Sequence, residues 1–211
     1  MLRKMLFVLA FALALNVAPG WAQSFEVTAF GGIRLGGNFN YDSFRNTGSV
    51  VSTKVDVANT PNFGVILDVT LNDYTQLELL FDHQSSELTA ENPPADLENI
   101  PVIDLNIDYY QVGGLYQRPY GDARPFLAVT LGATHLNPKG DFENRWRFSG
   151  GLAVGTKFFF SESIGLRLQS RLMGTVINDA NVLCDVFGCF VAGGTYMVQI
   201  DFSGGLIIAI E

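Results

Sequence analysis

Runs of about ten residues, apolar at every second position, recur along almost the whole length of this chain. After residue 22 no segment is apolar for long enough to cross a membrane as a helix. Strands cross a bilayer only as a closed barrel, because no backbone group can stay unpaired in hydrocarbon. The pattern therefore predicts an all-β fold, an eight-stranded antiparallel up-and-down transmembrane β-barrel. Its strands are expected at 25–35, 63–71, 76–82, 105–116, 127–132, 146–157, 164–173 and 196–208.

The first residues have the composition of a targeting segment. Arg3 and Lys4 give a basic start, residues 5–15 are apolar, and small residues at 20 and 22 flank a cleavage point. The apolar run is too short to span a membrane. We therefore predict a secretory signal peptide at 1–22 and a single barrel domain at 23–211.

Composition narrows the possible partners. The chain has 13 Lys and Arg residues against 21 Asp and Glu residues, so it lacks the basic face that nucleic acid requires. No His or Cys cluster has the spacing of metal ligands, and no glycine-rich loop suits a phosphate. We expect no nucleic acid, metal or cofactor, and membrane lipid as the main partner.

The links between the strands predict an orientation. Links at 72–74, 117–124 and 161–163 are short, whereas those at 37–60, 86–104 and 176–194 are long and polar. Short turns are typical of the periplasmic side and long loops of the exterior, which places both termini in the periplasm. Aromatic residues at the strand ends predict two girdles at the membrane interfaces. They are Phe25, Tyr74, Tyr120, Phe126 and Phe158 near the turns, and Phe39, Phe63, Phe81, Trp146, Phe148 and Tyr196 near the loops.

The fourth strand interrupts the alternation. Asn106 and Asp108 share one face, but the parity breaks across 109–112, which predicts a β-bulge there.

Charged residues on the enclosed faces form two opposed groups. Folding the second strand onto the third puts Asp68 opposite Glu78, and folding the sixth onto the seventh puts Lys157 opposite Arg167. These two hairpins face each other across an eight-stranded barrel. The predicted luminal charge patches comprise Asp68, Glu78, Asp82, Lys157, Arg167, Arg171 and Asp201.

These patches favour a plugged lumen. An interior of eight strands is barely wide enough for its own side chains, and buried charges need partners. We expect the carboxylates and cations to neutralise each other and to block the lumen. The alternative is a charged gate in a narrow pore for small solutes.

The resemblance to a known family rests on three Gly-Gly pairs, at 31–32, 113–114 and 150–151, and on the Arg-Pro-Phe entry at 124–126. With the eight alternating segments, these motifs resemble the small outer-membrane barrels of the OmpA and opacity-protein kind. The resemblance implies a location in the outer membrane of a Gram-negative-type envelope and a structural or surface-interaction role. It implies a protein that is not an enzyme and whose long loops contact an extracellular ligand or surface.

Two features of the exposed parts leave alternatives open. Cys184 and Cys189 lie in one long loop and, in an oxidising compartment, could form a small-loop disulfide. His83, Ser85 and Glu87 occupy alternate, outward positions near the external leaflet. They suggest a second alternative, an outer-leaflet lipid hydrolase, against the simpler interpretation of polar residues where a strand leaves the membrane.

A soluble ligand-binding barrel is the rival fold. It would need apolar side chains inside, so Leu79, Val129 and Leu168 would point into a dry centre rather than into lipid.

Overall fold

The computed structural model describes residues 24–44, 50–91, 103–139, 144–176, 183–185, 188–190 and 196–210. The signal peptide predicted at 1–22 lies outside these residues. No helix among them is long and apolar enough to span a bilayer. The described chain forms the strands β1 (Phe25–Gly36), β2 (Asn38–Phe44), β3 (Val50–Val57), β4 (Thr60–Asn72), β5 (Thr75–Glu91), β6 (Ile103–Gln117), β7 (Ala123–Pro138), β8 (Arg145–Phe159), β9 (Ile164–Val176), β10 (Leu183–Asp185), β11 (Gly188–Phe190) and β12 (Tyr196–Ile210).

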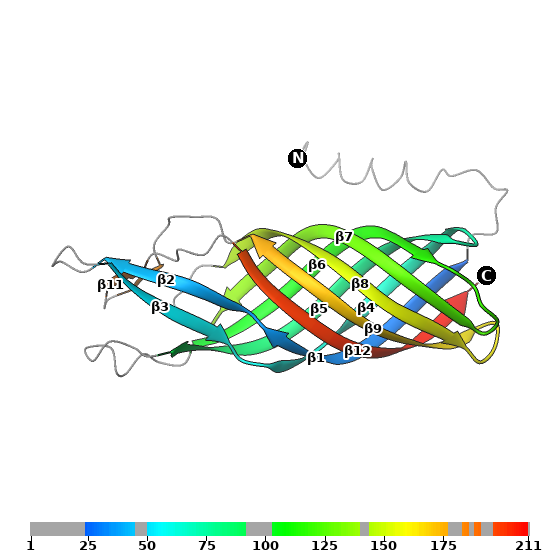
Figure 1. Cartoon of the computed structure of the whole chain (residues 1–211), viewed down its shortest axis with the longest axis horizontal. Helices are drawn as coiled ribbons and strands as arrows, with labels where there is room; N and C mark the ends of the chain where they lie inside the picture. The colour runs from blue at the N-terminus through cyan, green and yellow to red at the C-terminus, as the bar shows by residue number, and fades with distance from the viewer. Residues whose placement is uncertain are drawn as a thin grey trace, which may run out of the picture.

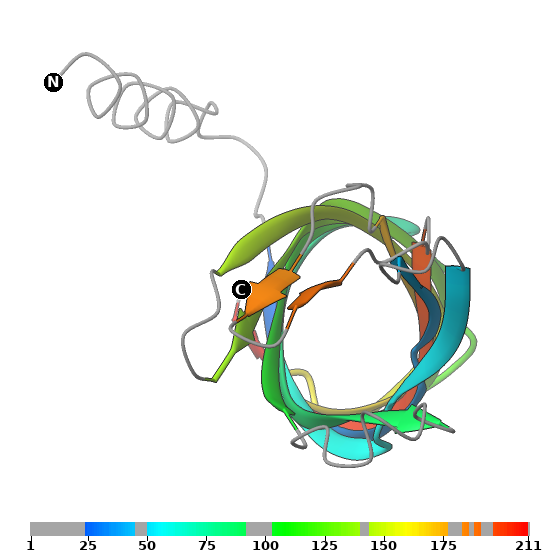
Figure 2. The same ribbon diagram turned by 90° about the vertical axis from the view of Figure 1, so that its left-hand side faces the viewer.

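Eight of these strands close into a barrel. In the order β1, β4, β5, β6, β7, β8, β9 and β12, each pairs antiparallel with the next, and β12 pairs with β1. The strands tilt steeply across the long axis, and the end view shows them as a ring (Figures 1 and 2). The predicted eight-stranded antiparallel barrel is therefore confirmed.

The barrel wall separates apolar from polar side chains as the alternation predicts. Leu79, Val129 and Leu168 point outward and are 40%, 53% and 47% exposed. The inward positions between such residues carry buried polar and charged side chains. A soluble barrel would reverse this arrangement, whereas a lipid-facing wall requires it.

The predicted bulge in the fourth strand is wrong. β6 pairs without interruption with β5 and with β7 across 109–112. Tyr109 is completely buried inside and Tyr110 is 44% exposed outside, so the alternation continues through them. The parity of apolar residues breaks in the sequence because an aromatic residue occupies an inner position. The register shift in this sheet lies instead between Thr70 and Asn72, at the end of β4.

The first long loop contains a hairpin that was not predicted from the sequence. Within 37–60, β2 pairs with β3, and the end of β3 pairs with the end of β5 from Lys54↔Glu91 to Val57↔Leu88. The hairpin continues the barrel wall beyond the eight barrel strands (Figure 1). Four of the eight residues at 50–57 are valines, whose branched side chains suit strands.

A second, short hairpin lies in the last long loop. Its strands β10 and β11 place Cys184 directly opposite Cys189 in the backbone register. Their side chains lie outside the described residues, so the disulfide stays a prediction.

Most aromatic girdle residues face outward at the strand ends, but Phe126 does not. Phe25, Tyr74, Tyr120 and Phe158 are exposed near the short turns. Phe126 is buried in the lumen, where the guanidinium of Arg167 lies 4.4 Å from its ring centre. Near the loops, the exposed aromatic residues are Phe63, Phe81, Trp146, Phe148 and Tyr196. The side chain of Phe39 lies outside the described residues.

Candidate functional site in the barrel lumen

The half of the lumen nearer the short turns contains an alternating series of acidic and basic side chains, all buried. We call this series the lower ionic layer. Its strands β1, β4, β5, β8 and β9 surround the lumen, so the series crosses the interior. In order of contact, it consists of Glu26, Lys157, Asp68, Arg167, Glu78 and Arg171.

Two of the three cations of this layer, Lys157 and Arg167, each bridge two carboxylates. The Lys157 ammonium lies 2.5 Å from Glu26 and 2.7 Å from Asp68. Arg167 donates through Nη1 to Asp68 at 2.8 Å and through Nη2 to Glu78 at 2.5 Å. In each case the shared cation attracts both carboxylates and offsets the repulsion between them.

Arg171, the last cation of the layer, pairs with a carboxylate that lies lower in the barrel. Arg171 donates to Oε1 of Glu78 at 2.7 Å rather than to Asp82, which lies higher on the same strand as Glu78. The barrel's stagger brings β9 residues opposite lower residues of β5. With three carboxylates and three cations, the lower ionic layer has no net formal charge.

Nearer the loops, a second group crosses the lumen, and we call Arg34, Asn62, Asp82 and Asp201 the upper ionic layer. Arg34 Nη2 donates a hydrogen bond to Asp82 and lies 3.4 Å from Asp201. The Asn62 amide donates to Asp201 at 2.9 Å and to Asp82 at 3.2 Å. All four side chains are buried. One cation and one amide therefore hold two carboxylates in this layer.

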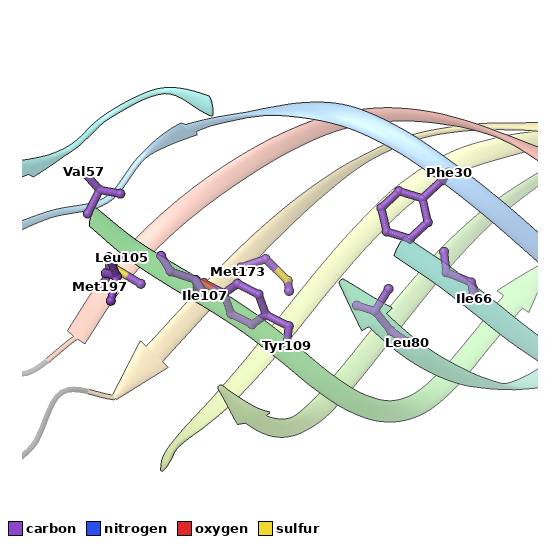
Figure 3. Packing of buried hydrophobic residues seen from close by; sticks show 9 residues of the cluster. All are labelled: Phe30, Val57, Ile66, Leu80, Leu105, Ile107, Tyr109, Met173 and Met197. Atoms are coloured by element: carbon purple, nitrogen blue, oxygen red, sulfur yellow. The ribbon is translucent and has the colours of Figure 1, made fainter. Parts of the chain in front are cut away.

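Apolar side chains separate the ionic layers and cover the upper one. Figure 3 shows Phe30, Ile66 and Leu80 in one group and Tyr109 with Met173 in another, closer to the loop end of the barrel. Tyr109 donates its hydroxyl to Gln199 at 2.7 Å, and the Arg34 guanidinium lies 4.8 Å from its ring centre. The lumen is therefore packed with side chains in both ionic and apolar zones.

The structure brings together every predicted luminal charge and adds two. All seven predicted residues are buried in the lumen, where they form parts of the two ionic layers. Glu26 and Arg34 were not predicted as members of the patches, although the alternation of β1 puts both on its polar face. Their partners depend on how β1 closes the barrel, which a single strand does not reveal. Their charge at inner positions of the first strand is the feature of the sequence from which both residues can be predicted.

A second polar group lies on the outer wall near the loop end. We call His83, Ser85, Asn106, Asp108 and His135 the rim cluster. Its residues come from the neighbouring strands β5, β6 and β7. The sequence pattern combined His83 and Ser85 with Glu87, but the carboxylate that contacts His83 is Asp108, at 2.5 Å. Among the described residues no group of His, Cys, Asp and Glu has the arrangement of a metal site.

A closed barrel with an apolar outer wall and a charged interior defines the class of small transmembrane β-barrels. The family described as "Outer membrane protein beta-barrel domain" matches residues 7–188, and the chain belongs to this family. It is therefore a protein of the outer membrane, in the envelope of Gram-negative type, and is embedded in lipid. No curated protein gives a significant match.

Solved structures show the same fold at low sequence identity. OprG from Pseudomonas aeruginosa is 10% identical with a TM-score of 0.54, over 90% of this chain and 97% of that one. Neisserial surface protein A is 13% identical with a TM-score of 0.51, over 87% and 96%. The outer membrane protease OmpT of Escherichia coli is 8% identical with a TM-score of 0.51, over 90% and 99%. These similarities concern the fold alone, which serves a surface protein and a protease alike.

Proposed function

We propose that this protein is a non-conducting outer-membrane anchor that presents its extracellular strands and loops for interaction with a ligand or surface. Export through the predicted signal peptide is part of this proposal. The observation that carries it is the lower ionic layer, in which each of six buried charges has an oppositely charged partner within 2.8 Å. Ions crossing the lumen would have to displace these partners, and an unpartnered buried charge costs several kcal/mol.

The purified protein in planar lipid bilayers is expected to show no steady single-channel conductance, because the ion pairs occupy the cross-section. As a matched control, Arg167→Ser with Glu78→Ser removes one charge of each sign and leaves space in the same layer. We expect this variant to conduct. Large, steady conductance of the unchanged protein would favour the narrow pore instead.

The surface role is supported by the β2–β3 hairpin, which extends the wall beyond the eight barrel strands (Figure 1). Loops and extensions on a rigid scaffold are where such barrels keep binding functions. The hairpin can be cut at its base, where the amide of Val57 donates to the carbonyl of Gly37 at 2.9 Å. The cut also removes the pairing of residues 54–56 with the end of β5.

Excision of residues 38–56, with an Asn-Gly turn to join the hydrogen-bonded ends, is expected to abolish adhesion and to leave the barrel folded. Adhesion is measured with cells that carry the protein, on immobilised extracellular-matrix proteins and on host cells. The folded barrel is checked by its shifted migration in unheated detergent gels. Unchanged adhesion after excision, or no adhesion of the unchanged protein, would contradict a surface role for the hairpin.

A further inference from the structure

The rim cluster joins a hydroxyl, an imidazole and a carboxylate in one series. His83 Nδ1 lies 2.5 Å from Oδ1 of Asp108, and His83 Nε2 lies 3.3 Å from Oγ of Ser85. We propose that Ser85, His83 and Asp108 form a nucleophilic site that hydrolyses carboxylic esters of amphiphiles in the outer leaflet. This inference goes beyond the anchor function and does not depend on it.

The order of the contacts fixes the role of each group. A carboxylate can only accept, so the ring proton of His83 lies on Nδ1 and is donated to Asp108. In the neutral imidazole that this mechanism requires, Nε2 carries no proton and can accept that of the Ser85 hydroxyl. A hydroxyl becomes a nucleophile when a base stands beside it and a third group orients that base.

Neighbouring residues hold the base and the acid in place. The Phe63 ring packs against the His83 ring with their centres 5.1 Å apart. On the other side, His135 lies 3.5 Å from the second carboxylate oxygen of Asp108 and stacks on Trp146 at 4.7 Å. We assign Phe63, His135 and Trp146 as positioning residues.

Asn106 supplies an amide group at the nucleophile. In this structure the Ser85 hydroxyl donates to Oδ1 of Asn106 at 2.9 Å. A half-turn of the amide exchanges its oxygen for its NH2 group without moving the heavy atoms appreciably. The Ser85 proton is then free to face His83, and the NH2 group can stabilise the oxyanion that forms on the substrate.

The position of the cluster indicates the substrate class. One residue pair nearer the membrane centre, on the same face, lie the girdle residue Phe81 and Tyr110, whose tilted rings have their centres 5.2 Å apart. Such girdles lie at the headgroup level of a bilayer. The nucleophile therefore lies where the ester carbonyls of membrane lipids are found, with an apolar wall below it for an acyl chain.

The reaction balances without a further reagent. Ser85 Oγ forms a bond to the ester carbonyl carbon while His83 Nε2 takes the hydroxyl proton. The bond between that carbon and the alcohol oxygen then breaks, and His83 returns the proton to the leaving oxygen. Water attacks the acyl-serine by the same transfers, releases the carboxylic acid and restores the hydroxyl.

The proposal is tested with purified protein in detergent micelles and in vesicles of diacyl phosphatidylethanolamine and phosphatidylglycerol. We expect release of fatty acid from the vesicles, hydrolysis of a p-nitrophenyl acyl ester in micelles, and covalent labelling of Ser85 by a fluorophosphonate. Ser85→Ala should lower both hydrolysis rates by at least ~10³-fold. Asp108→Asn should lower them by at least ~10²-fold and keep the barrel folded.

Two neighbouring substitutions serve as matched controls. Ser86 faces inward and donates to the carbonyl of Ala58, so Ser86→Ala should leave hydrolysis unchanged. Glu87→Gln should also leave it unchanged, because Asp108 is the acid of the series. The proposal is overturned if the folded protein is neither labelled nor active, if the label is on another serine, or if Ser85→Ala keeps its activity. Hydrolysis of the micellar ester without release from vesicles would overturn the lipid substrate.

Discussion

Arg167→Met is expected to lower the free energy of unfolding by about 3–5 kcal/mol, as is typical when one partner of a buried ion pair is removed. Arg167 bridges Asp68 at 2.8 Å and Glu78 at 2.5 Å from a completely enclosed position. Without it, the lower ionic layer carries one excess negative charge, and its two central carboxylates face each other without a shared cation. Methionine keeps much of the volume, so the loss reports on charge. The measurement is equilibrium urea unfolding in detergent micelles, followed by tryptophan fluorescence.

A double variant separates the charge from the packing. Adding Glu78→Gln to Arg167→Met restores the balance between acids and cations in the lower ionic layer, and the amide oxygen of the new side chain would still accept from Arg171. We expect the double variant to recover more than half of the lost stability, which a double-mutant cycle measures as a coupling energy. If the second substitution instead adds its own full cost, the layer is not held together by its charges.

Arg34→Leu is expected to lower the free energy of unfolding by a similar amount, about 3–5 kcal/mol, because Arg34 is the only cation of the upper ionic layer. It contacts both Asp82 and Asp201, and all three side chains are buried. After the substitution the Asn62 amide is the one side-chain donor to the two carboxylates that remains among the described residues. Unfolding in urea measures the loss, and Asp82→Asn in the same background should restore part of it.

An exposed ion pair provides the control for this second prediction. Lys139 contacts Asp104 at 3.0 Å, but their side chains are 64% and 48% exposed. Exposed pairs of this kind contribute little, since water and salt screen them. Lys139→Ala should therefore leave the unfolding midpoint unchanged within error. If Arg34→Leu behaved like Lys139→Ala, the upper ionic layer would not stabilise the barrel.

The two ionic layers and the rim cluster depend on the same register between strands. Asp68 and Glu78 are direct partners in the β4–β5 ladder, and His83 and Asp108 are direct partners in the β5–β6 ladder. The first pair spans a short turn, so counting outward from the turn predicted it. The second spans the long link at 92–102, across which no such count is possible. This is why the sequence pointed to Glu87 rather than Asp108 as the carboxylate beside His83.

Two errors in the predictions from sequence share a physical origin. The lumen was expected to be polar, so an inward Tyr109 was interpreted as a bulge and an inward Phe126 as a girdle residue. Both rings instead pack against guanidinium groups, of Arg34 and of Arg167. An aromatic face attracts a cation, which lets an apolar ring take a place inside an ionic lumen.

The amino-acid sequence alone predicts which side of each strand faces lipid. That property is local, because successive side chains of a strand point to opposite faces and need no knowledge of the neighbours. Which charges meet across the lumen and at the rim depends instead on how the whole barrel is assembled. Closure of β1 on β12 and the stagger of the strands brought Arg34 to Asp82 and Arg171 to Glu78. Those distances depend on the tilt of all eight strands together, a quantity that no single segment contains.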